Sequence, residues 1–402
     1  MSARTLFRLV DAAAAAASIP ALAASGYLGA LTAFSKPVEP PRINGKRPFF
    51  DVIVPAHDEE ANIAGTVSSI LAVDYPRDRF RVVVVADNCT DATAARARQA
   101  GAHVIERVDT DRRGKGYALA RAFEETLAER RADAVVVVDA DTRVTKNLLH
   151  AFAARLSAGE VAVQAEYGVR NPEASWRTRL MVVALTLFHV LRSNARERLG
   201  LSCGLRGNGM GFACSVLREV PHDAYSIVED VEYGIRLGEA GHRVAYVGEA
   251  AVLGEMVSTG RAARSQRDRW EKGRRALRDA HGWRLVKRGL VERNAMLFDL
   301  GADLLVPPLT RLGAWIAFGL GASAAAGVLV IASGGSPIAW IPWAAAGALT
   351  GAYVFRGVQL TRLGARAALD LAWAPVYAVW KLGLAASGPP STWVRTTREK
   401  VQ

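Results

Sequence analysis

Three polar clusters, each directly after a short apolar run, hold the side chains best suited to chemistry. They occupy residues 55–59, 87–91 and 139–142. In open α/β sheets, ligands bind at the carboxyl ends of the strands, so the three clusters are expected to converge on one crevice. An isolated Asp after a strand is more often a turn former or a helix cap. The prediction therefore depends on the joint placement of the clusters.

Asp139 and Asp141 are candidate ligands for one divalent cation, Mg²⁺ or Mn²⁺. They are two residues apart, so their side chains share a face if the strand continues through them, and carboxylate oxygens suit a hard cation. Such an ion could neutralise a departing diphosphate. The alternative is a strand end with solvated carboxylates. The apolar run at residues 135–138 defines the strand end well and favours the metal site.

Residues 112–116 form a basic, glycine-rich turn before a helical pattern at 117–130. A helix N-terminus in this setting suits a phosphate group, with Lys115 beside it. The turn is not a Walker A loop, because Asp109 and Gly116 stand where that motif needs Gly and Ser or Thr. An exposed basic turn is the alternative.

Two later motifs are also candidates. Asp230, preceded by Glu229, opens a helical stretch and could act as a general base, although acidic residues are favoured in any first helical turn. Residues 266–270 combine planar donors with an indole, groups suited to a diphosphate and a sugar. The alternative for that segment is a basic amphipathic helix lying on a membrane.

The segment of about residues 45–300 must position these groups. Short β-branched runs predict buried strands at 50–55, 81–87, 103–106 and 134–139, with amphipathic helical patterns between them. This βαβ alternation predicts an α/β fold with a mainly parallel sheet and helices on both faces.

Composition points to a membrane. Half of the 402 residues are hydrophobic, and 51 Lys and Arg against 39 Asp and Glu give a net charge of +12. A basic and apolar chain favours a membrane protein or a membrane-surface enzyme over a wholly soluble one. Three cysteines without metal-ligand spacing argue against a disulfide framework and for a reducing environment.

Apolar stretches at 9–34, 314–333 and 338–355 are long enough to be membrane spans. Basic flanks place the middle segment, the start of the second span and the end of the third span on the cytoplasmic side, so the uncharged turn at 333–337 faces outward. The first stretch also resembles a cleavable signal peptide, but that interpretation would export a segment whose motifs suit a cytoplasmic nucleotide. Residues 367–387 could be a fourth span, but Asp370 and Lys381 within them favour an interfacial helix.

The expected organisation therefore has four parts. Residues 1–44 form an N-terminal transmembrane anchor, and 45–300 form a cytoplasmic catalytic domain. Residues 301–366 form a transmembrane helical hairpin, and 367–402 form an interfacial amphipathic helix with a basic cytoplasmic tail. This organisation predicts a multi-pass protein of the inner (plasma) membrane.

The motifs in their order resemble the membrane-embedded branch of the family 2 glycosyltransferases, which includes cellulose, chitin and hyaluronan synthases. The resemblance covers about residues 48–300 and the flanking helices. It rests on six elements: the PxxxE start at Pro55, the strand-end Asp87, the Gly-Lys turn at Lys115, the DxD at Asp139, the Glu229-Asp230 pair and the QxxRW at Gln266. The resemblance implies a GT-A, Rossmann-like fold, a divalent cation and inversion at the anomeric carbon.

The resemblance also assigns roles by position. The nucleotide sugar would be bound by Pro55, Glu59, Asp87, Lys115, Asp139, Gln266, Arg269 and Trp270, and the metal would be held by Asp139 and Asp141. The catalytic residues would be Glu229, Asp230 and Arg269, with Asp230 as the base. The loop beneath the acceptor would consist of Gly207, Asn208 and Gly209. Two departures, Asp58 where Asn is usual and the Asn88-Cys89 pair, leave the detailed nucleoside contacts open.

The implied reaction moves a sugar from a nucleotide-sugar donor to a hydroxyl of a polysaccharide or lipid-linked glycan. The expected donor is a UDP-sugar. Nucleic acid is not an expected partner, whereas a second copy of the chain or an export protein is. Single and repeated transfer both remain open, because few spans are present. The rival functions are a nucleotidyltransferase that makes nucleotide sugars and a noncatalytic membrane subunit.

Overall fold

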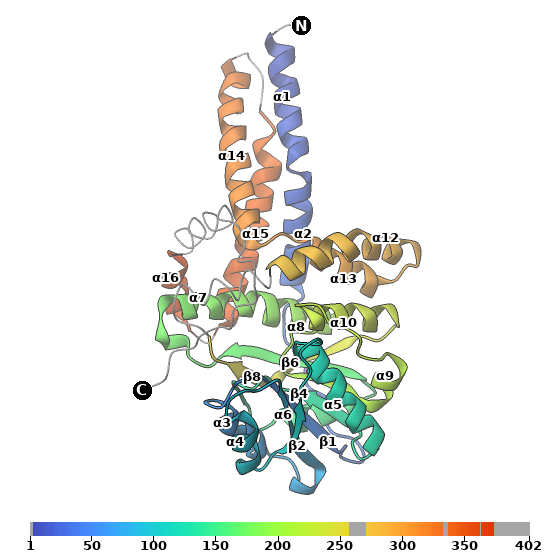
Figure 1. Cartoon of the computed structure of the whole chain (residues 1–402). Helices are drawn as coiled ribbons and strands as arrows, with labels where there is room; N and C mark the ends of the chain where they lie inside the picture. Colours follow the sequence, from blue (N-terminus) through green and yellow to red (C-terminus); the bar gives the residue numbers. More distant parts are fainter. Residues whose placement is uncertain (1–2, 257–270, 333–336, 362, 374–402) are drawn as a thin grey trace.

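A single eight-stranded sheet forms the centre of the globular part of the protein (Figure 1). The computed structural model describes residues 3–256, 271–332, 337–361 and 363–373. The strand order across the sheet is β3-β2-β1-β4-β7-β6-β8-β5. The strands are β1 (Phe50–Ala56), β2 (Phe80–Asp87), β3 (His103–Arg107), β4 (Ala134–Val137), β5 (Thr142–Val144), β6 (Ala162–Val169), β7 (Met210–Ala213) and β8 (Val244–Gly254).

The sheet is mixed and mostly parallel. Strand β1 pairs in parallel with both β2 and β4, and β2 pairs in parallel with β3. These are the four strands that the β-branched runs predict, so that prediction is confirmed. Strand β7 then runs antiparallel to β4 and β6, while β6 and β8 are parallel and β5 is antiparallel to β8.

Apolar side chains alternate between the two faces of the sheet, and each face has its own helical cover. Val52 and Val54 belong to one buried core and Ile53 to the other. The first core is covered by α3 (Ile63–Leu71), α4 (Thr93–Gln99) and α6 (Leu148–Ser157); the second is covered by α5 (Lys115–Glu129), α9 (Cys214–Glu219) and α10 (Glu229–Glu239). The expected α/β architecture with helices on both faces is therefore confirmed.

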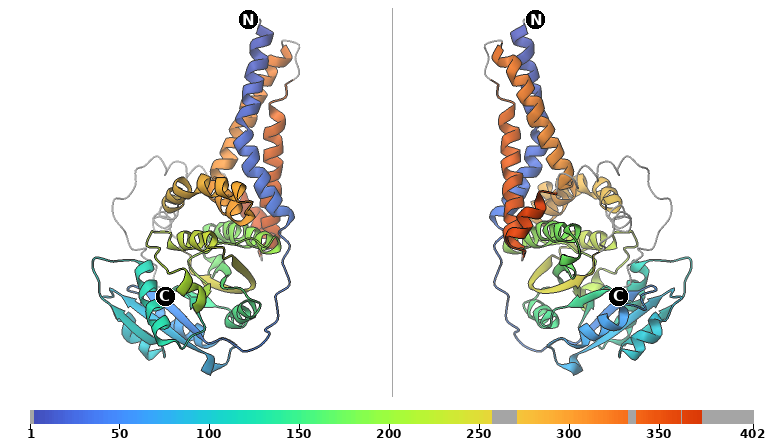
Figure 2. Two further views of the ribbon diagram at one scale, coloured as in Figure 1. Left: turned by 90° about the vertical axis from the view of Figure 1, so that its right-hand side faces the viewer. Right: turned by 90° about the vertical axis from the view of Figure 1, so that its left-hand side faces the viewer.

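A layer of helices lies between the sheet and a projecting helical bundle (Figure 2). We call it the connecting layer. It consists of α7 (Trp176–Leu185), the π-helical segment Thr186–Leu191, α8 (Arg192–Arg198), helical residues 271–277, the π-helical segment Arg278–Gly282, α12 (Trp283–Val291) and α13 (Ala295–Leu305). Single 3₁₀ turns occur at Arg77–Arg79 and Pro172–Ala174.

The bundle consists of α1 (Ala3–Ala17), α2 (Ile19–Ala33), α14 (Leu309–Ala332) and α15 (Trp340–Leu360). Within the described residues, α14 is long and apolar enough to cross a membrane. The bent pair Arg8–Ala17 and Ile19–Ala33 would add a second span if it is counted as one. The three-span prediction is thus supported for α14 and, on that condition, for the N-terminal stretch, whereas α15 does not pass the same test.

Asp11, the charge within the first apolar stretch, has a structural role. Its carboxylate accepts hydrogen bonds from the backbone N–H groups of Ile338 at 2.9 Å and Ala339 at 3.2 Å, just before α15 begins. Backbone N–H groups at a helix start lack partners within the helix, so an acidic side chain there stabilises it. Asp11 thereby ties α1 to α15 across the bundle.

The predicted interfacial segment is described only at its start. Helix α16 (Ala365–Leu371) packs on α7, where Arg179 Nε donates to Asp370 at 2.6 Å, and Trp176 stacks on Trp373. Residues 374–402, which include the predicted basic tail, lie outside the described residues.

Candidate active site

The loops that follow β1 and β2 lie against each other, as their position after neighbouring parallel strands predicts. His57 Nδ1 lies 2.8 Å from the carbonyl oxygen of Asp87, and the backbone N–H of Glu59 donates to Thr93 Oγ1 at 2.7 Å. Asp58 and Asn88 adopt left-handed backbone conformations, with φ of 50° and 52°. Asn and Asp tolerate this conformation better than most residues. The departure from the family pattern at Asp58 therefore keeps the same backbone geometry accessible.

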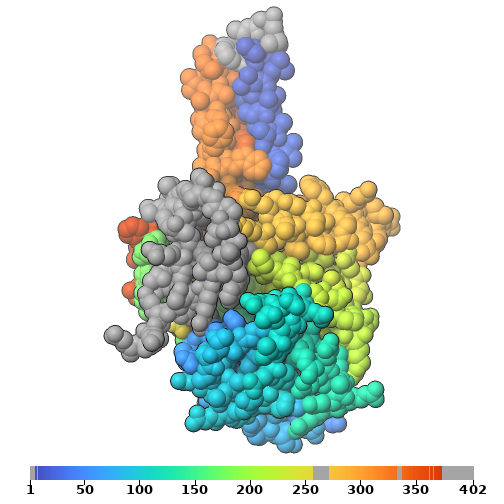
Figure 3. Space-filling model, viewed as in Figure 1, coloured from blue at the N-terminus to red at the C-terminus, as the bar shows by residue number. Residues whose placement is uncertain are grey.

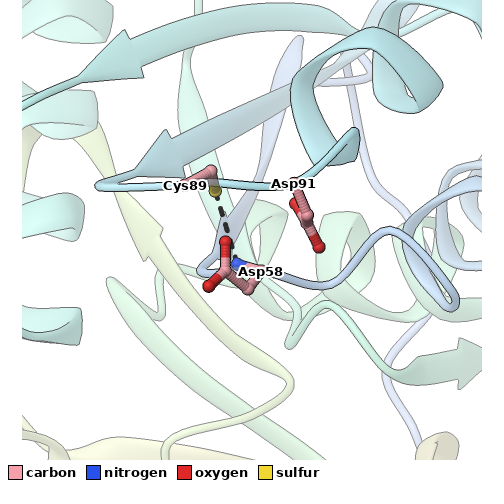
Figure 4. Close-up of side chains that lie close together, drawn as sticks. All are labelled: Asp58, Cys89 and Asp91. Atoms are coloured by element: carbon pink, nitrogen blue, oxygen red, sulfur yellow. Dashed lines mark hydrogen bonds between the residues drawn. The ribbon is translucent and has the colours of Figure 1, made fainter.

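Asp58, Cys89 and Asp91 gather where these two loops meet (Figure 4). Their potential ligand atoms all lie within 4.8 Å of one another. The cluster already has partners, because Thr90 N donates to Asp58 Oδ1 at 2.7 Å and Glu60 N donates to Asp91 Oδ2 at 3.1 Å. We interpret this cluster as a structural contact that fixes the positions of the two loops relative to each other.

Asp87, at the carboxyl end of β2, is buried and paired. Arg107 at the end of β3 donates to its Oδ1 at 2.6 Å and also binds Asp109 at 2.9 Å. The nucleoside contact expected at Asp87 would therefore involve a carboxylate whose position Arg107 holds. Arg107 was not identified as a site residue from the sequence, although its position directly after a predicted strand could have indicated that it lies at the crevice. Pro55 lies at the carboxyl end of β1, beyond the residues that pair with β4.

Lys115 brings three of the predicted motifs together. It is the first residue of α5, after Gly114 with φ of 124°, a conformation that favours glycine. Its Nζ donates to Asp139 Oδ1 at 2.5 Å and also to the carbonyl oxygen of Gly207. Burial alone would lower the pKa of Lys115, but the carboxylates of Asp139, Glu229 and Asp230 outweigh it and raise that pKa above its ordinary value.

The structure corrects the geometric argument for Asp139 and Asp141. Strand β4 ends at Val137, and the chain then turns into β5, where Thr142 N donates to the carbonyl oxygen of Asp139 at 3.1 Å. The two carboxylates therefore do not share a strand face. Asp139 nevertheless suits a cation chemically, since its carboxylate holds the Lys115 ammonium group. Asp141 follows two residues later on the same turn.

The predicted acceptor loop depends on a buried amide. Asn208 is fully buried; its Oδ1 accepts from the backbone N–H of Asp139 at 3.1 Å, and its Nδ2 donates to Thr142 Oγ1 at 2.8 Å. Gln164 of β6, also buried, donates to the carbonyl oxygen of Asn208 at 2.7 Å. The Asn208 side chain therefore shapes the DxD turn, and Gly207 is the residue of this loop that lies beside Asp230 and Lys115. Gln164 carried no signal in the sequence.

Gly207 and Gly209 take left-handed conformations, with φ of 76° and 70°. A Cβ atom on Gly209 would lie 2.8 Å from Val252, so glycine is needed there for packing as well as for backbone conformation. A Cβ atom on Gly207 would lie 3.3 Å from Asp230 Oδ2 and 3.7 Å from Lys115 Nζ. The loop therefore passes directly beside the proposed base.

We expect Asn208→Ala to lower the free energy of unfolding by about 2–3 kcal/mol, because it leaves the Asp139 N–H without its acceptor and removes the amide that donates to Thr142 Oγ1. Urea unfolding measures the loss. The matched control is Asn147→Ala, which removes one exposed bond to the carbonyl oxygen of Glu249 and should cost less than about 1 kcal/mol. Equal losses in the two variants would contradict the role given to Asn208.

Glu229 and Asp230 begin α10, as the sequence predicts. Burial raises the pKa of Glu229 to about 7, against the opposing charge of Lys115. Burial also raises the pKa of Asp230, again opposed by Lys115. A carboxylate with a raised pKa is a stronger base than an exposed one, which suits proton transfer near neutral pH.

The structure thus brings together Asp139, Lys115, Gly207 and Asp230, which come from four different parts of the sequence. Glu59 lies in the β1 loop, where its Oε2 accepts from Asn62 Nδ2 at 3.0 Å. Gln266, Arg269 and Trp270 lie outside the described residues.

Comparisons with known proteins bear on the family and on the fold. A family model described as "Glycosyltransferase like family 2" matches residues 47–273. A β-monoglucosyldiacylglycerol synthase of Synechocystis is 31% identical over 226 residues, which make up 55% of this chain and 47% of that protein. YdaM, a probable glycosyltransferase of Bacillus subtilis, is 25% identical over 231 residues, or 56% of this chain and 55% of that protein. The chain spans about half the length of these curated relatives.

Among solved structures, the mannosyltransferase PcManGT of Pyrobaculum calidifontis, in complex with GDP-Man and Mn²⁺, superposes with a TM-score of 0.53. The alignment covers 89% of this chain and 97% of that chain at 20% identity, so it bears on the fold alone. The GT-A fold that the resemblance implies is confirmed. Since the family model covers more than half of the residues, the chain belongs to glycosyltransferase family 2.

Proposed function

We propose that this protein is an inverting glycosyltransferase that moves a sugar from a nucleotide-sugar donor, UDP-linked in the first instance, to a hydroxyl of a lipid-linked or polysaccharide acceptor. The observation that carries the proposal is the convergence of a basic group, a DxD carboxylate and a partly buried carboxylate, Asp230, as the proposed base. Lys115 bonds both Asp139 and the carbonyl oxygen of Gly207, and Gly207 lies beside Asp230. A scaffold subunit has no physical need for this arrangement.

In the proposed mechanism, Asp230 takes the proton of the acceptor hydroxyl as its oxygen attacks the anomeric carbon. The bond to the diphosphate breaks on the opposite side, so one displacement inverts the anomeric configuration. Asp139 and Asp141 would hold Mg²⁺ or Mn²⁺, which when bound supplies positive charge to the departing diphosphate. Lys115 adds a further positive charge beside Asp139, and Arg269 is proposed to act on the same diphosphate.

We further propose that the bundle crosses the plasma membrane more than once, with the catalytic domain on the cytoplasmic side. Bundle helices carry large apolar side chains on their outer surface, among them Phe318 at 76% exposed, Val328 at 65% and Phe355 at 64%. Such a surface is unfavourable in water and favourable in hydrocarbon. This supports a membrane setting for α15 as well as for α14. A lipid acceptor also fits the name of the Synechocystis relative.

The first test is donor turnover by purified protein in nanodiscs, with UDP- and GDP-sugars and either Mg²⁺, Mn²⁺ or EDTA. We expect metal-dependent release of nucleoside diphosphate. Asp139→Asn should weaken the binding of Mn²⁺ in the presence of donor by more than about tenfold, measured as a higher apparent Kd for Mn²⁺. The matched control is Asp111→Asn in a neighbouring exposed loop, which should leave that Kd unchanged. Release of pyrophosphate from a nucleoside triphosphate and a sugar phosphate would instead favour the nucleotidyltransferase.

A further inference from the structure

A cavity lies between the catalytic domain and the connecting layer, on the side of α10 that faces α13. Its lining comes from α8, the loop at 202–206, α10, helical residues 271–277 and α13, and includes Arg196, Arg206, Arg274 and Asp303. Gly207, which lies beside Asp230, directly follows Arg206 in the chain. The cavity therefore approaches the proposed base from the side of the helical bundle.

The charges around this cavity are unbalanced. Asp303 accepts from Arg192 at 2.8 Å, from Arg196 at 2.8 Å and from Arg274 at 3.0 Å. Asp299 accepts from Arg196 at 2.7 Å. Among the described residues, four guanidinium groups, counting Arg206, thus surround the carboxylates of Asp299 and Asp303, and Asp230 is a further negative charge that acts on Arg206.

Of these four arginines, Arg206 is the one without an ion pair to a described carboxylate. Its terminal nitrogen donates to the carbonyl oxygen of Cys203 at 2.8 Å, its Nε is buried without a hydrogen-bond partner, and it makes no ion pair with a described carboxylate. Its guanidinium lies 4.4 Å from the centre of the Phe188 ring, against which Arg192 and Arg274 also pack. Burial lowers the pKa of Arg206 to about 10, even though Asp303 opposes the shift.

A guanidinium that is largely removed from water and has no direct ion-pair partner is unfavourable, because Asp303 and Asp230 act on it only from a distance and the interior does not replace its lost hydration. Phe188 compensates only partly, since a cation–π contact contributes about 0.5–2 kcal/mol. The geometry around Arg206 is therefore that of a site which an anion would complete. A guanidinium fork is especially suited to phosphate oxygens.

A second cavity lies next to this site, toward the foot of α14. Its lining includes Arg274, Arg275, Arg278 and Arg311, with Glu271 as an acidic neighbour, and its apolar wall contains Pro307 and Pro308. Arg274 and Leu304 line both cavities, so the two adjoin. Arg311 lies in the first turn of α14. In Figure 3 the orange α14 rises above the amber helices of the connecting layer. The basic lining thus runs from the base of α14 to Arg206.

We infer that these two cavities bind the phosphate of an anionic lipid head group and present a hydroxyl of that lipid to Asp230. The inference rests on the proposed function, and it narrows the acceptor to a phosphate-bearing lipid. The hydroxyl oxygen forms a bond to the anomeric carbon, the bond from that carbon to the diphosphate breaks, and the hydroxyl proton passes to Asp230. The phosphate of the lipid takes no part in the bond changes. It pairs with Arg206 and Arg274 and so positions the head group.

The location supports a lipid over a soluble anion. The lining begins at the foot of α14, the helix apolar enough to span a membrane, where phosphate head groups would lie. Basic side chains close to such a surface attract anionic lipids. The adjoining apolar residues, Leu304 and Val306, suit the glycerol and acyl region next to a phosphate.

The test is thermal unfolding of the purified full chain in detergent, without a sugar donor. Phosphatidylglycerol, uncharged diacylglycerol, inorganic phosphate and UDP are titrated separately. We expect phosphatidylglycerol alone to raise Tm strongly. Arg206→Gln should raise its half-saturating concentration by about tenfold or more, as expected when a charged hydrogen bond is lost. Arg311→Gln removes a positive charge from the second cavity and should raise that concentration as well. The matched control Arg218→Gln, an exposed position on α9, should respond like the wild type.

The Tm of the lipid-free Arg206→Gln variant shows whether a lost lipid response comes from misfolding. It removes a buried charge without an ion-pair partner, so the lipid-free variant should unfold at the same Tm as the wild type or a higher one. Equal stabilisation by diacylglycerol, or reproduction of the effect by phosphate or UDP, would overturn the inference. So would an unchanged lipid response in both cavity variants. Since no donor is present, these outcomes are independent of whether the protein transfers a sugar, which nucleoside diphosphate release tests separately.

Discussion

Asp230→Asn is expected to reduce kcat for sugar transfer by about 10²–10⁴-fold while the protein stays folded and binds its donor. The amide cannot accept the acceptor proton, yet it has nearly the same shape as the carboxylate beside Gly207 and Lys115. Donor binding by calorimetry and turnover by product release separate the two properties. The matched control is Glu232→Gln in the same helical turn, whose carboxylate pairs with Arg236, and it should keep most of the activity.

The pH dependence of the wild type tests the same role. Burial raises the pKa of both Glu229 and Asp230, to about 7 for Glu229, so the deprotonated pair is lost as pH falls through the neutral range. We therefore expect kcat/KM to decline below about pH 7 on the acidic side. The two carboxylates repel each other, so Glu229→Gln should make Asp230 easier to deprotonate and move the decline to lower pH. A fully active Asp230→Asn variant would exclude Asp230 as the base. A flat profile between pH 5 and 8 would contradict the raised pKa of Glu229 and its effect on the reaction.

Asp303→Ala is expected to lower the free energy of unfolding by about 3–5 kcal/mol. This carboxylate pairs with three arginines, so its removal leaves several buried positive charges without compensation. Chemical unfolding in detergent without added lipid measures the effect. Asp303→Asn keeps the shape but not the charge and should lose a similar amount.

The matched control for this prediction is Asp279→Ala. Asp279 pairs with Arg278 at 2.7 Å on the surface of the same layer, and exposed pairs contribute less than about 1 kcal/mol. If Asp303→Ala and Asp279→Ala have equal effects, the buried arginine cluster is not held together by Asp303. In that case the imbalance of charge around Arg206 would need another explanation.

Several features of the site followed from local sequence alone. The runs before Asp87 and Asp139 are short, β-branched and followed by polar residues, and such runs fold as buried strands whose ends carry ligands. The turn before Lys115 is rich in glycine, and the structure uses a positive φ at Gly114 to start α5 there. The Glu229-Asp230 pair opens a helix because acidic residues stabilise the first turn.

The metal-site geometry shows where local reasoning failed. A spacing of two implies a shared face only while the strand lasts, and β4 ends two residues before Asp139. The turn that follows is shaped by Asn208, 69 residues farther along the chain, whose amide binds the Asp139 N–H. No local pattern reveals a hydrogen bond of that kind, because it depends on β7 pairing with β4.

The sequence by itself determined the family, the parallel half of the sheet and the order of the catalytic motifs, since each depends on residues close together in the chain. Only the tertiary structure decided which distant groups meet. It placed Lys115 between Asp139 and Gly207, buried the carboxylates of α10, and set Arg192 against Asp303 across 111 positions of sequence. Charge and burial at such places are set by packing between elements. The unbalanced arginines that point to an anionic lipid were therefore visible only in the folded protein.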